Sequence, residues 1–211
     1  MDCQTKTMDP VVRDILTVGL AEFAARGLAG ARVDAIAART HTSKRMIYYH
    51  FESKEGLYTA VLDHAYRLVR GDAFNASQLR ARPPLEGLIE LVGHAFDSHC
   101  EHPEFVRLVM YENLQGAHVI SQLPDIARLN QQGLDMVADL LARGQAEGSM
   151  RKGILARDVY MLYIGQCFHF VSNRSSVQAV LGSGQDPDAE RAARRAGVIE
   201  SVRRFVETRD E

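Results

Sequence analysis

One short segment of the chain, "RTHTSKRMIYYHFESKEGLY" from Arg39 to Tyr58, concentrates side chains that can bind a polyanion. It holds four basic residues, two histidines and three tyrosines, in a chain of 211 residues whose formal net charge is -2. Cations and tyrosine hydroxyls bind phosphate oxygens, but a chain without net positive charge has no overall field that gathers nucleic acid. Any nucleic-acid surface must therefore be a local patch, and this segment is the candidate for it.

The basic and aromatic residues of this segment share one face of an expected helix. Lys44, Arg45, Tyr48 and Tyr49 have the spacing i, i+1, i+4 and i+5, which places them on the same side. A solvated basic face is the alternative interpretation. The combination of positive charge, tyrosines and the positive end of the helix dipole favours binding of phosphates instead.

Residues that can cap helices flank the basic face. Thr42 or Ser43 can cap the expected helix at 43–50, which leaves its N-terminal amides directed at the surface that meets phosphates. Ser53 can cap the following helix, with Lys54 beside it.

The elements that position this segment are helices. Apolar residues recur at the helical period in almost every part of the chain, and no strand alternation is convincing. Breaks fall at glycine and proline residues, and repeats and low-complexity tracts are absent from the sequence. The prediction is an all-α protein of about nine helices, near residues 10–26, 33–39, 43–50, 53–70, 85–101, 103–115, 124–147, 156–174 and 187–207.

The second and third of these helices have the spacing of a helix-turn-helix, because only "THT" separates them. Ile36 and Ala37 on one helix and Ile47 and Phe51 on or after the next supply the apolar contacts, with the small Ala37 where the two backbones must approach. Packing thus accounts for one face of the third helix and leaves its basic face unexplained. That face is predicted to be a DNA-recognition surface.

Several other classes of function find little support in the sequence. The N-terminus has no apolar export core, and the longest nearly apolar run, 159–171, is too short to span a membrane, so the cytoplasm is the expected location. Cys3, Cys100 and Cys167 lack disulfide or zinc-knuckle spacing. "HAFDSHCEH" at 94–102 has poor metal-ligand spacing, and no catalytic motif is present. We expect no metal, no cofactor and no enzymatic activity.

The segment "VDAIAARTHTSKRMIYYHFESKEGLY" is similar to the N-terminal signature of TetR-type transcriptional regulators. The resemblance covers roughly residues 10–58 and includes S-K at the start of the recognition helix, Y-Y-H-F and S-K-E-x-L. It implies that Lys44, Arg45 and Met46 face DNA bases, and that further residues hold or approach the DNA backbone. These are Tyr48, Tyr49 and Lys54, with His50 as a further candidate. Thr42 and Ser43 at the capped start of the helix, and Arg32 before the second helix, complete the predicted DNA-binding residues.

Two positions depart from the family pattern. The family usually has glycine in the turn where this chain has His41, which predicts a turn of different shape, because a left-handed conformation costs histidine free energy. The family also tends to place Thr or Ser before the second helix, where this chain has Ala31 and Arg32. The capping bond is expected to be lost there, and Arg32 is expected to contact phosphate instead.

The helices near 156–174 and 187–207 are expected to pair with those of a second copy. Both carry wide apolar faces, and the small residues Gly165, Ala192, Ala196 and Gly197 suit close helix approach. We predict a homodimer with a four-helix interface, because a two-fold dimer supplies the second half-site contact. The alternative is that these helices only cover the core of the monomer.

Polar residues that interrupt apolar stripes on helices 103–115 and 156–174 predict a pocket for a small molecule. Buried polar groups need partners, and they find them either in a ligand or in each other and the nearby backbone. Both explanations stay open. The candidate lining residues are Phe96, His99, Tyr111, Glu112, Asn113, Tyr163, Gln166, Phe170 and Asn173.

Together these observations predict a DNA-binding domain at 1–70 and an effector-binding and dimerisation domain at 71–211. The expected function is a ligand-responsive repressor that binds an inverted-repeat double-stranded DNA operator and is released by a small molecule, with helix 53–70 as the lever. The segment "HPEFVRLVMYENLQG" also looks like regulators of pyrimidine or N-heteroaromatic catabolism, which implies a heteroaromatic or carboxylate effector. A small all-α enzyme or carrier is the rival hypothesis.

Overall fold

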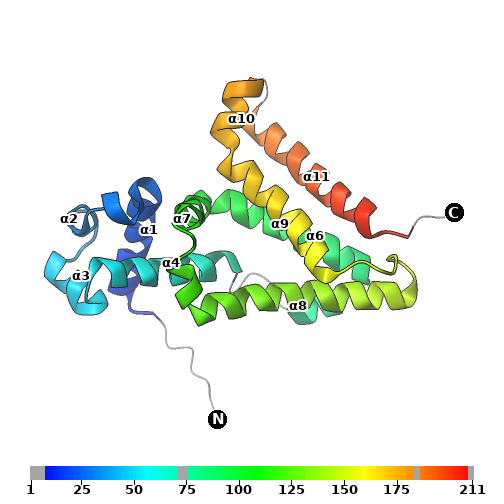
Figure 1. Cartoon of the computed structure of the whole chain (residues 1–211), viewed down its shortest axis with the longest axis horizontal. Helices are drawn as coiled ribbons and strands as arrows, with labels where there is room; N and C mark the ends of the chain where they lie inside the picture. The colour runs from blue at the N-terminus through cyan, green and yellow to red at the C-terminus, as the bar shows by residue number, and fades with distance from the viewer. Residues whose placement is uncertain (1–7, 71–75, 183–185, 209–211) are drawn as a thin grey trace, which may run out of the picture.

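The computed structural model describes residues 8–70, 76–182 and 186–208, and Figure 1 shows that they are arranged as helices. These residues form no strand, which confirms the all-α prediction. The elements are α1 (Pro10–Gly30), α2 (Val33–Ala37), α3 (Lys44–Phe51), α4 (Lys54–Arg70), α5 (Ala76–Arg80), α6 (Pro84–Glu101), α7 (Pro103–Leu114), the short 3-10 helix η1 (Ile120–Gln122), α8 (Pro124–Glu147), α9 (Ala156–Ser172), α10 (Arg174–Leu181) and α11 (Pro187–Val206).

All nine predicted helices are present, with ends that differ by a few residues. Two further helices, α5 and α10, were not predicted from the apolar periodicity, because each is only one to two turns long. None of the α10 side chains is buried, and its three apolar residues at helical spacing, Val177, Val180 and Leu181, are too few to separate this helix from its neighbours in the sequence. The predicted helix 156–174 is in fact α9, followed directly by α10 after Asn173.

The head of the molecule, α1 to α3, shares its core with helices from the rest of the chain. Phe23, Ile36, Ile47 and Leu57 are fully buried in one cluster from α1 to α4. The same cluster contains Phe105, Val106 and Leu108 of α7 and Ile126 and Leu129 of α8. In Figure 1, α4 runs from the head toward α8, and α1 packs against both α4 and α7. The head is therefore held to the rest by a continuous apolar core.

A second apolar cluster lies among α6, α8, α9 and α11. Its buried members include Leu88, Phe96, Leu140, Val159 and Val198. The helices of this cluster lie away from α1 to α3, on the other side of the molecule (Figure 1). The fold thus has one core around the head and α4 and another around the long C-terminal helices.

The end of α1 depends on a glycine. Gly27 has φ 64° and ψ 177°, a region that is essentially restricted to glycine, and the helix kinks there before it ends at Gly30. A Cβ at this position would lie 3.2 Å from the ring of Tyr111 on α7. The kink therefore lets the end of α1, just before the helix-turn-helix, pack closely against α7.

We expect Gly27→Ala to lower the free energy of unfolding by roughly 1–3 kcal/mol, because alanine cannot adopt this backbone conformation without strain. Gly30→Ala is the matched control, since Gly30 does not have a positive φ and a Cβ there would make only an ordinary contact with Arg26. Urea unfolding of the two variants measures the difference. Equal stability of both variants would contradict the role given to Gly27.

Candidate nucleic-acid interface and effector cavity

The predicted recognition helix α3 packs against the core with one face and is exposed to solvent on the other. Its Ile47 is fully buried, and the Ser43 Oγ accepts a hydrogen bond from the backbone N–H of Met46 at 3.2 Å, which confirms Ser43 as the helix cap. The opposite face is exposed, and Tyr49 reaches 76% exposure. The exposed residues on this face are Lys44, Arg45, Met46, Tyr48 and Tyr49.

The two cations at the start of α3 differ in their surroundings. Lys44 Nζ lies 2.9 Å from a carboxylate oxygen of Asp34 on α2, and its hydrogen bond to Asp34 is the main cause that raises the pKa of Lys44. Arg45 makes no ion pair with any residue in the described ranges. Arg45 is therefore the cation of α3 whose guanidinium is available without breaking an existing contact.

The start of α2 shows how the family departure at Arg32 is accommodated. The Arg32 side chain makes no capping hydrogen bond to α2, as expected. Instead, the buried carboxylate of Glu22 on α1 accepts a hydrogen bond from the Arg32 backbone N–H at 3.2 Å and also pairs with Arg26. Glu22 could not be predicted from the sequence, because an acceptor supplied from ten residues earlier leaves no local signature.

The turn before α3 avoids the left-handed conformation that glycine would favour. His41 does not have a positive φ, and its backbone N–H donates to Asp14 Oδ2 at 3.4 Å, so this turn lacks the conformation that would cost histidine free energy. Thr42 is half-buried and lies beside the cap residue Ser43. The exposed residue Glu52, after α3, has a φ of 63° instead.

The start of α4 lies next to the end of α1. Ser53 Oγ accepts a hydrogen bond from the Gly56 N–H at 2.9 Å, and Lys54 Nζ donates to the Ala29 carbonyl at 3.2 Å. His50 is half-buried, with its ring 5.3 Å from that of Tyr49. Of the predicted DNA contacts, Lys54 thus begins α4, while most of the others lie on α3.

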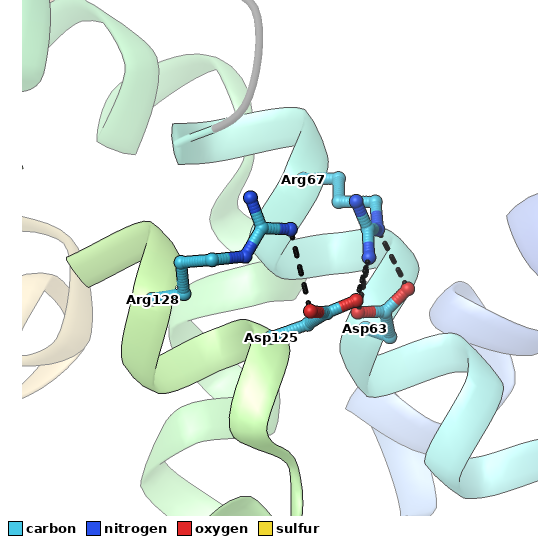
Figure 2. A network of polar contacts seen from close by, with 4 residues as sticks. All are labelled: Asp63, Arg67, Asp125 and Arg128. Atoms are coloured by element: carbon cyan, nitrogen blue, oxygen red, sulfur yellow. Dashed lines mark hydrogen bonds and ion pairs between the residues drawn. The ribbon is translucent and has the colours of Figure 1, made fainter. Parts of the chain in front are cut away.

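Farther along α4, a network of charged residues joins this helix to α8 (Figure 2). Arg67 binds Asp63 one turn earlier and Asp125 at the start of α8, both at 2.7 Å, and Arg128 pairs with Asp125 at 3.3 Å. The hydrogen bond to Arg67 is the first cause, and that to Arg128 the second, that lower the pKa of Asp125. The network connects the middle of α4 to the C-terminal helices through solvent-accessible contacts.

A buried contact joins α4 to α7. The Tyr58 hydroxyl donates to Glu112 Oε1 at 2.8 Å, and Glu112 Oε2 accepts hydrogen bonds from the backbone N–H groups of Val119 at 3.1 Å and Ile120 at 3.2 Å. Glu112 is only 2% exposed. Its carboxylate therefore has three donors within the protein.

A cavity of about 360 Å³ lies where the end of α4 meets α5, α6, α8 and α9. Its volume is in the range typical of small-molecule sites, roughly 300–1,000 Å³. Aliphatic, aromatic and charged side chains share its wall. The lining residues are Val69, Arg70, Leu79, Arg80, Leu91, His94, Ala95, His99, Leu129, Gln132, Gly133, Asp135, Met136, Asp139, Leu140, Tyr160 and Tyr163.

The nine residues predicted to line a single pocket do not line one cavity. His99 and Tyr163 lie in the wall of this cavity, whereas Gln166 and Phe170 line a second hollow of about 320 Å³ beside α10 and α11. Phe96 is buried and stacks on Phe170 with ring centroids 5.3 Å apart.

The remaining residues of the predicted set lie elsewhere. Tyr111 lies against Gly27, Glu112 is bonded to Tyr58 and the η1 backbone, and Asn113 is exposed. The Asn173 amide donates to Ser172 Oγ, and Gln166 bonds to Ser201 on α11 at 2.9 Å. For Glu112 and Gln166 the explanation by internal hydrogen bonds is the one that the geometry supports.

Several cavity residues could not be predicted from the sequence. Arg70 has the position of an ordinary basic residue in the last turn of a helix. Tyr160 lies on the predicted helix 156–174 but outside the stripe of that helix that predicted the pocket. The α8 wall follows a helical stripe of Leu129, Gly133, Met136 and Leu140, which the sequence contained but which looked like plain core packing. Only the meeting of five helices makes these residues neighbours.

His99 is a neutral imidazole at physiological pH. Burial first, and the nearby charge of Arg70 second, lower the pKa of His99 to about 4. Its Nδ1 lies 2.7 Å from the carbonyl oxygen of Ala95, so Nδ1 carries the proton and donates. The other ring nitrogen, Nε2, is then unprotonated and acts as an acceptor.

This shift predicts a specific loss of stability in acid. Because the folded pKa is below the unfolded value near 6.5, the contribution of His99 is complete above pH 6.5 and is lost as the pH falls toward 4, by about 3 kcal/mol in total. Urea unfolding of the wild type and of His99→Asn at several pH values isolates the contribution of His99 to the free energy of unfolding. An identical pH dependence of the two proteins would show that His99 titrates normally.

Comparisons with known proteins identify the family. The description "Bacterial regulatory proteins, tetR family" matches residues 15–61, and "Tetracyclin repressor-like, C-terminal domain" matches residues 84–202. The second match alone covers more than half of the chain. The chain belongs to the TetR family of transcriptional regulators. Members of this family bind DNA and small ligands, act as dimers and are regulators rather than enzymes, so the enzyme hypothesis is excluded.

Individual relatives agree with this assignment. The chain is 31% identical over 173 residues to the HTH-type transcriptional repressor NicS of Pseudomonas putida, covering 80% of this chain and 79% of that protein. It is 28% identical to the repressor SCO4008 of Streptomyces coelicolor, covering 92% and 93% of the two chains. The crystal structure of the putative regulator SCO4942 of the same organism matches with a TM-score of 0.69 and 26% identity, covering 93% of this chain and 98% of the other.

Within the described ranges, no cluster of three or more histidine, cysteine or acidic residues has the geometry to hold a metal ion. None of the helices described in this TetR-family chain has the length and apolarity to cross a membrane. Cys100 and Cys167 are free thiols, and Cys3 lies outside the described residues.

Proposed function

We propose that this regulator is a cytoplasmic repressor that binds an inverted-repeat operator as a homodimer and leaves it when a small effector binds. The observation that carries the proposal is the exposed basic and aromatic face of α3, with Arg45 free of ion pairs in the described ranges. The names of the relatives NicS and SCO4008, both called repressors, support the direction of regulation. Residues 1–70 then form the DNA-binding domain and residues 71–211 the effector-binding and dimerisation domain.

For the DNA contacts, we infer that Arg45 reads base edges with Lys44 and Met46, and that Tyr48, Tyr49 and Lys54 bind phosphates. Exposure of the α3 face supports these roles, and the free start of α3 adds backbone amides near Thr42 and Ser43. Lys44 must exchange Asp34 for DNA, and Lys54 must exchange the Ala29 carbonyl. Arg32 and His50 are proposed as outer contacts.

We infer that α9 and α11 pair with the same helices of a second copy. These two helices pack side by side and antiparallel in Figure 1 and leave small residues open on their outer surface. Gly165 on α9 and Ala192, Ala196 and Gly197 on α11 are exposed, and a Cβ added at either glycine would meet nothing within 4 Å. Small exposed residues allow close approach of helices, as a four-helix interface requires.

For the effector, we propose the cavity at the end of α4, because a ligand there contacts the same helix that begins at Lys54 beside the recognition helix. An effector shifts the dimer only by its different affinity for the DNA-bound and released states. Contact with the last turn of α4 supplies such a difference, since movement of this helix changes the position of α3. Of the residues expected in the pocket, His99 and Tyr163 are kept in this proposal.

A gel shift on the promoter DNA beside the gene tests the proposed function. We expect one dimer per inverted repeat by light scattering, and affinity that rises steeply as the salt concentration falls, because bound phosphates release counterions. Random DNA of equal length is the control. Equal affinity for both DNAs, or binding that does not tighten at low salt, would overturn the proposed function.

A further inference from the structure

Two residues that line the α4 cavity, Arg70 and His99, each carry a buried polar atom without a hydrogen-bond partner among the described residues. The two atoms are Nε of Arg70 and Nε2 of His99. His99 is only 1% exposed. A buried polar group without a hydrogen bond costs free energy, so each is a place where a ligand atom is stabilised.

The two atoms have opposite hydrogen-bonding roles. Arg70 Nε is a donor on a positively charged group, and His99 Nε2 is an acceptor, because the proton of this ring is on Nδ1 and bonds to Ala95. The two side chains are near enough that the charge of Arg70 lowers the pKa of His99. A molecule that satisfies both must accept from Arg70 and donate to His99.

Among the described residues, Arg70 is the cation of the cavity wall that has no carboxylate partner. Arg80 lies 3.4 Å from Asp139, so these two offset each other. Asp135 is exposed and accepts a hydrogen bond from Gln131, which places its charge toward solvent. Arg70 forms no ion pair with any described residue, and its guanidinium lies over the ring of Tyr160 at 5.8 Å.

The remaining wall favours a flat, largely apolar body. Tyr160 and Tyr163 meet edge to face with centroids 5.5 Å apart, and Leu91, Leu129 and Leu140 complete the apolar surface. The volume of about 360 Å³ suits a molecule of one or two rings. Aromatic walls of this kind pack against ring faces and edges.

We propose that the effector is a small aromatic carboxylate that also carries a hydrogen-bond donor, with the carboxylate on Arg70 and the donor on Nε2 of His99. This inference rests on the proposed function, because it assigns a ligand class to the proposed effector cavity. The carboxylate contacts the last residue of α4, so the charge of the ligand acts directly on the helix that leads to the DNA-binding surface. Neutral analogues of the same shape lack this contact.

Calorimetry with the full-length protein, without DNA, tests the ligand class. The probes are benzoate, the three hydroxybenzoate isomers and the amide of each. We expect the best hydroxybenzoate to bind roughly 10- to 100-fold more tightly than its amide, since a hydrogen bond between charged groups is lost in the amide. Equal binding of acid and amide, or no binding of any acid at millimolar concentration, overturns the proposal.

Variants identify the residues. Arg70→Gln is expected to abolish the preference for the acid over the amide, whereas Arg70→Lys is expected to keep the preference with weaker binding, because it retains the charge. Arg80→Gln is the matched control from the same wall, with an expected loss below about threefold, because Asp139 already offsets Arg80. An equal loss in both glutamine variants would assign the effect to general charge and overturn the role of Arg70.

The donor is tested through His99. In the His99→Asn variant, the hydroxybenzoates are expected to lose their higher affinity relative to benzoate, while the affinity for benzoate itself stays nearly the same. An unchanged advantage would overturn the role of Nε2. Melting temperatures establish that each variant is folded, and the gel shift on promoter DNA is measured separately. Failure of the wild type to bind DNA rejects the proposed function, whereas absent carboxylate binding by a DNA-binding wild type rejects only the ligand class.

Discussion

Arg45→Ala is expected to weaken binding to the operator by roughly 1–3 kcal/mol per half-site and to leave binding to random DNA nearly unchanged, as for a side chain that reads a base. The structural reason is that Arg45 is exposed on α3 and free of ion pairs in the described ranges, so its guanidinium reaches DNA at no cost in lost contacts. Gel shifts on operator and random DNA measure the two losses. Arg107→Ala, at an exposed arginine on α7 outside the proposed interface and DNA-binding face, controls for the change in net charge.

Lys54→Ala is the contrasting variant in the same experiment. A phosphate contact carries no sequence information, so its loss is expected to weaken binding to both DNAs about equally and to lower the salt slope by about one unit per half-site. Equal losses on operator and random DNA for Arg45→Ala would remove it from the base-reading set. An unchanged salt slope for Lys54→Ala would mean that Lys54 stays on the Ala29 carbonyl when DNA binds.

The head was predictable from sequence because its signals are local. Apolar spacing defined α2 and α3, and the cap at Ser43 acts within three residues of itself, so each feature could be recognised from neighbouring positions. Glu22 shows the limit of this reasoning. Its carboxylate, on another helix, accepts from the Arg32 N–H just before α2, and nothing in the sequence around Arg32 indicates a carboxylate ten residues earlier.

The cavity was predicted to exist, but most of its wall was not predicted. The prediction rested on polar residues in the apolar stripes of two helices, and two of these, Glu112 and Gln166, have their hydrogen-bond partners within the protein. Arg70 was overlooked because a basic residue in the last turn of a helix is common and needs no ligand to explain it. Tertiary contacts among five helices decide which polar groups stay unpaired, and single-helix periodicity contains no information about them.

Glu112→Ala is expected to lower the free energy of unfolding by about 3 kcal/mol or more, because it leaves three donors without an acceptor in the interior. These donors are the Tyr58 hydroxyl and the backbone N–H groups of Val119 and Ile120. Glu112→Gln is the matched control. Its amide oxygen can accept from the two backbone groups while its NH₂ donates to the Tyr58 oxygen, so a loss within about 1 kcal/mol is expected.

The same substitution separates a structural role of Glu112 from a role in binding the effector. Tyr58 lies one turn after Lys54 on α4, and its ring packs edge to face on Phe23 of α1 with centroids 5.0 Å apart. Loss of Glu112 therefore loosens the helix that adjoins the recognition helix, and operator affinity is expected to fall together with the melting temperature. Substitution of a residue that only binds the effector would have a different result: stability and operator affinity would stay normal, and only the response to the effector would be lost. If Glu112→Ala melts and binds operator like the wild type, the buried hydrogen bonds do not hold α4, and a coupling energy near zero between Tyr58→Phe and Glu112→Ala would establish the same point independently.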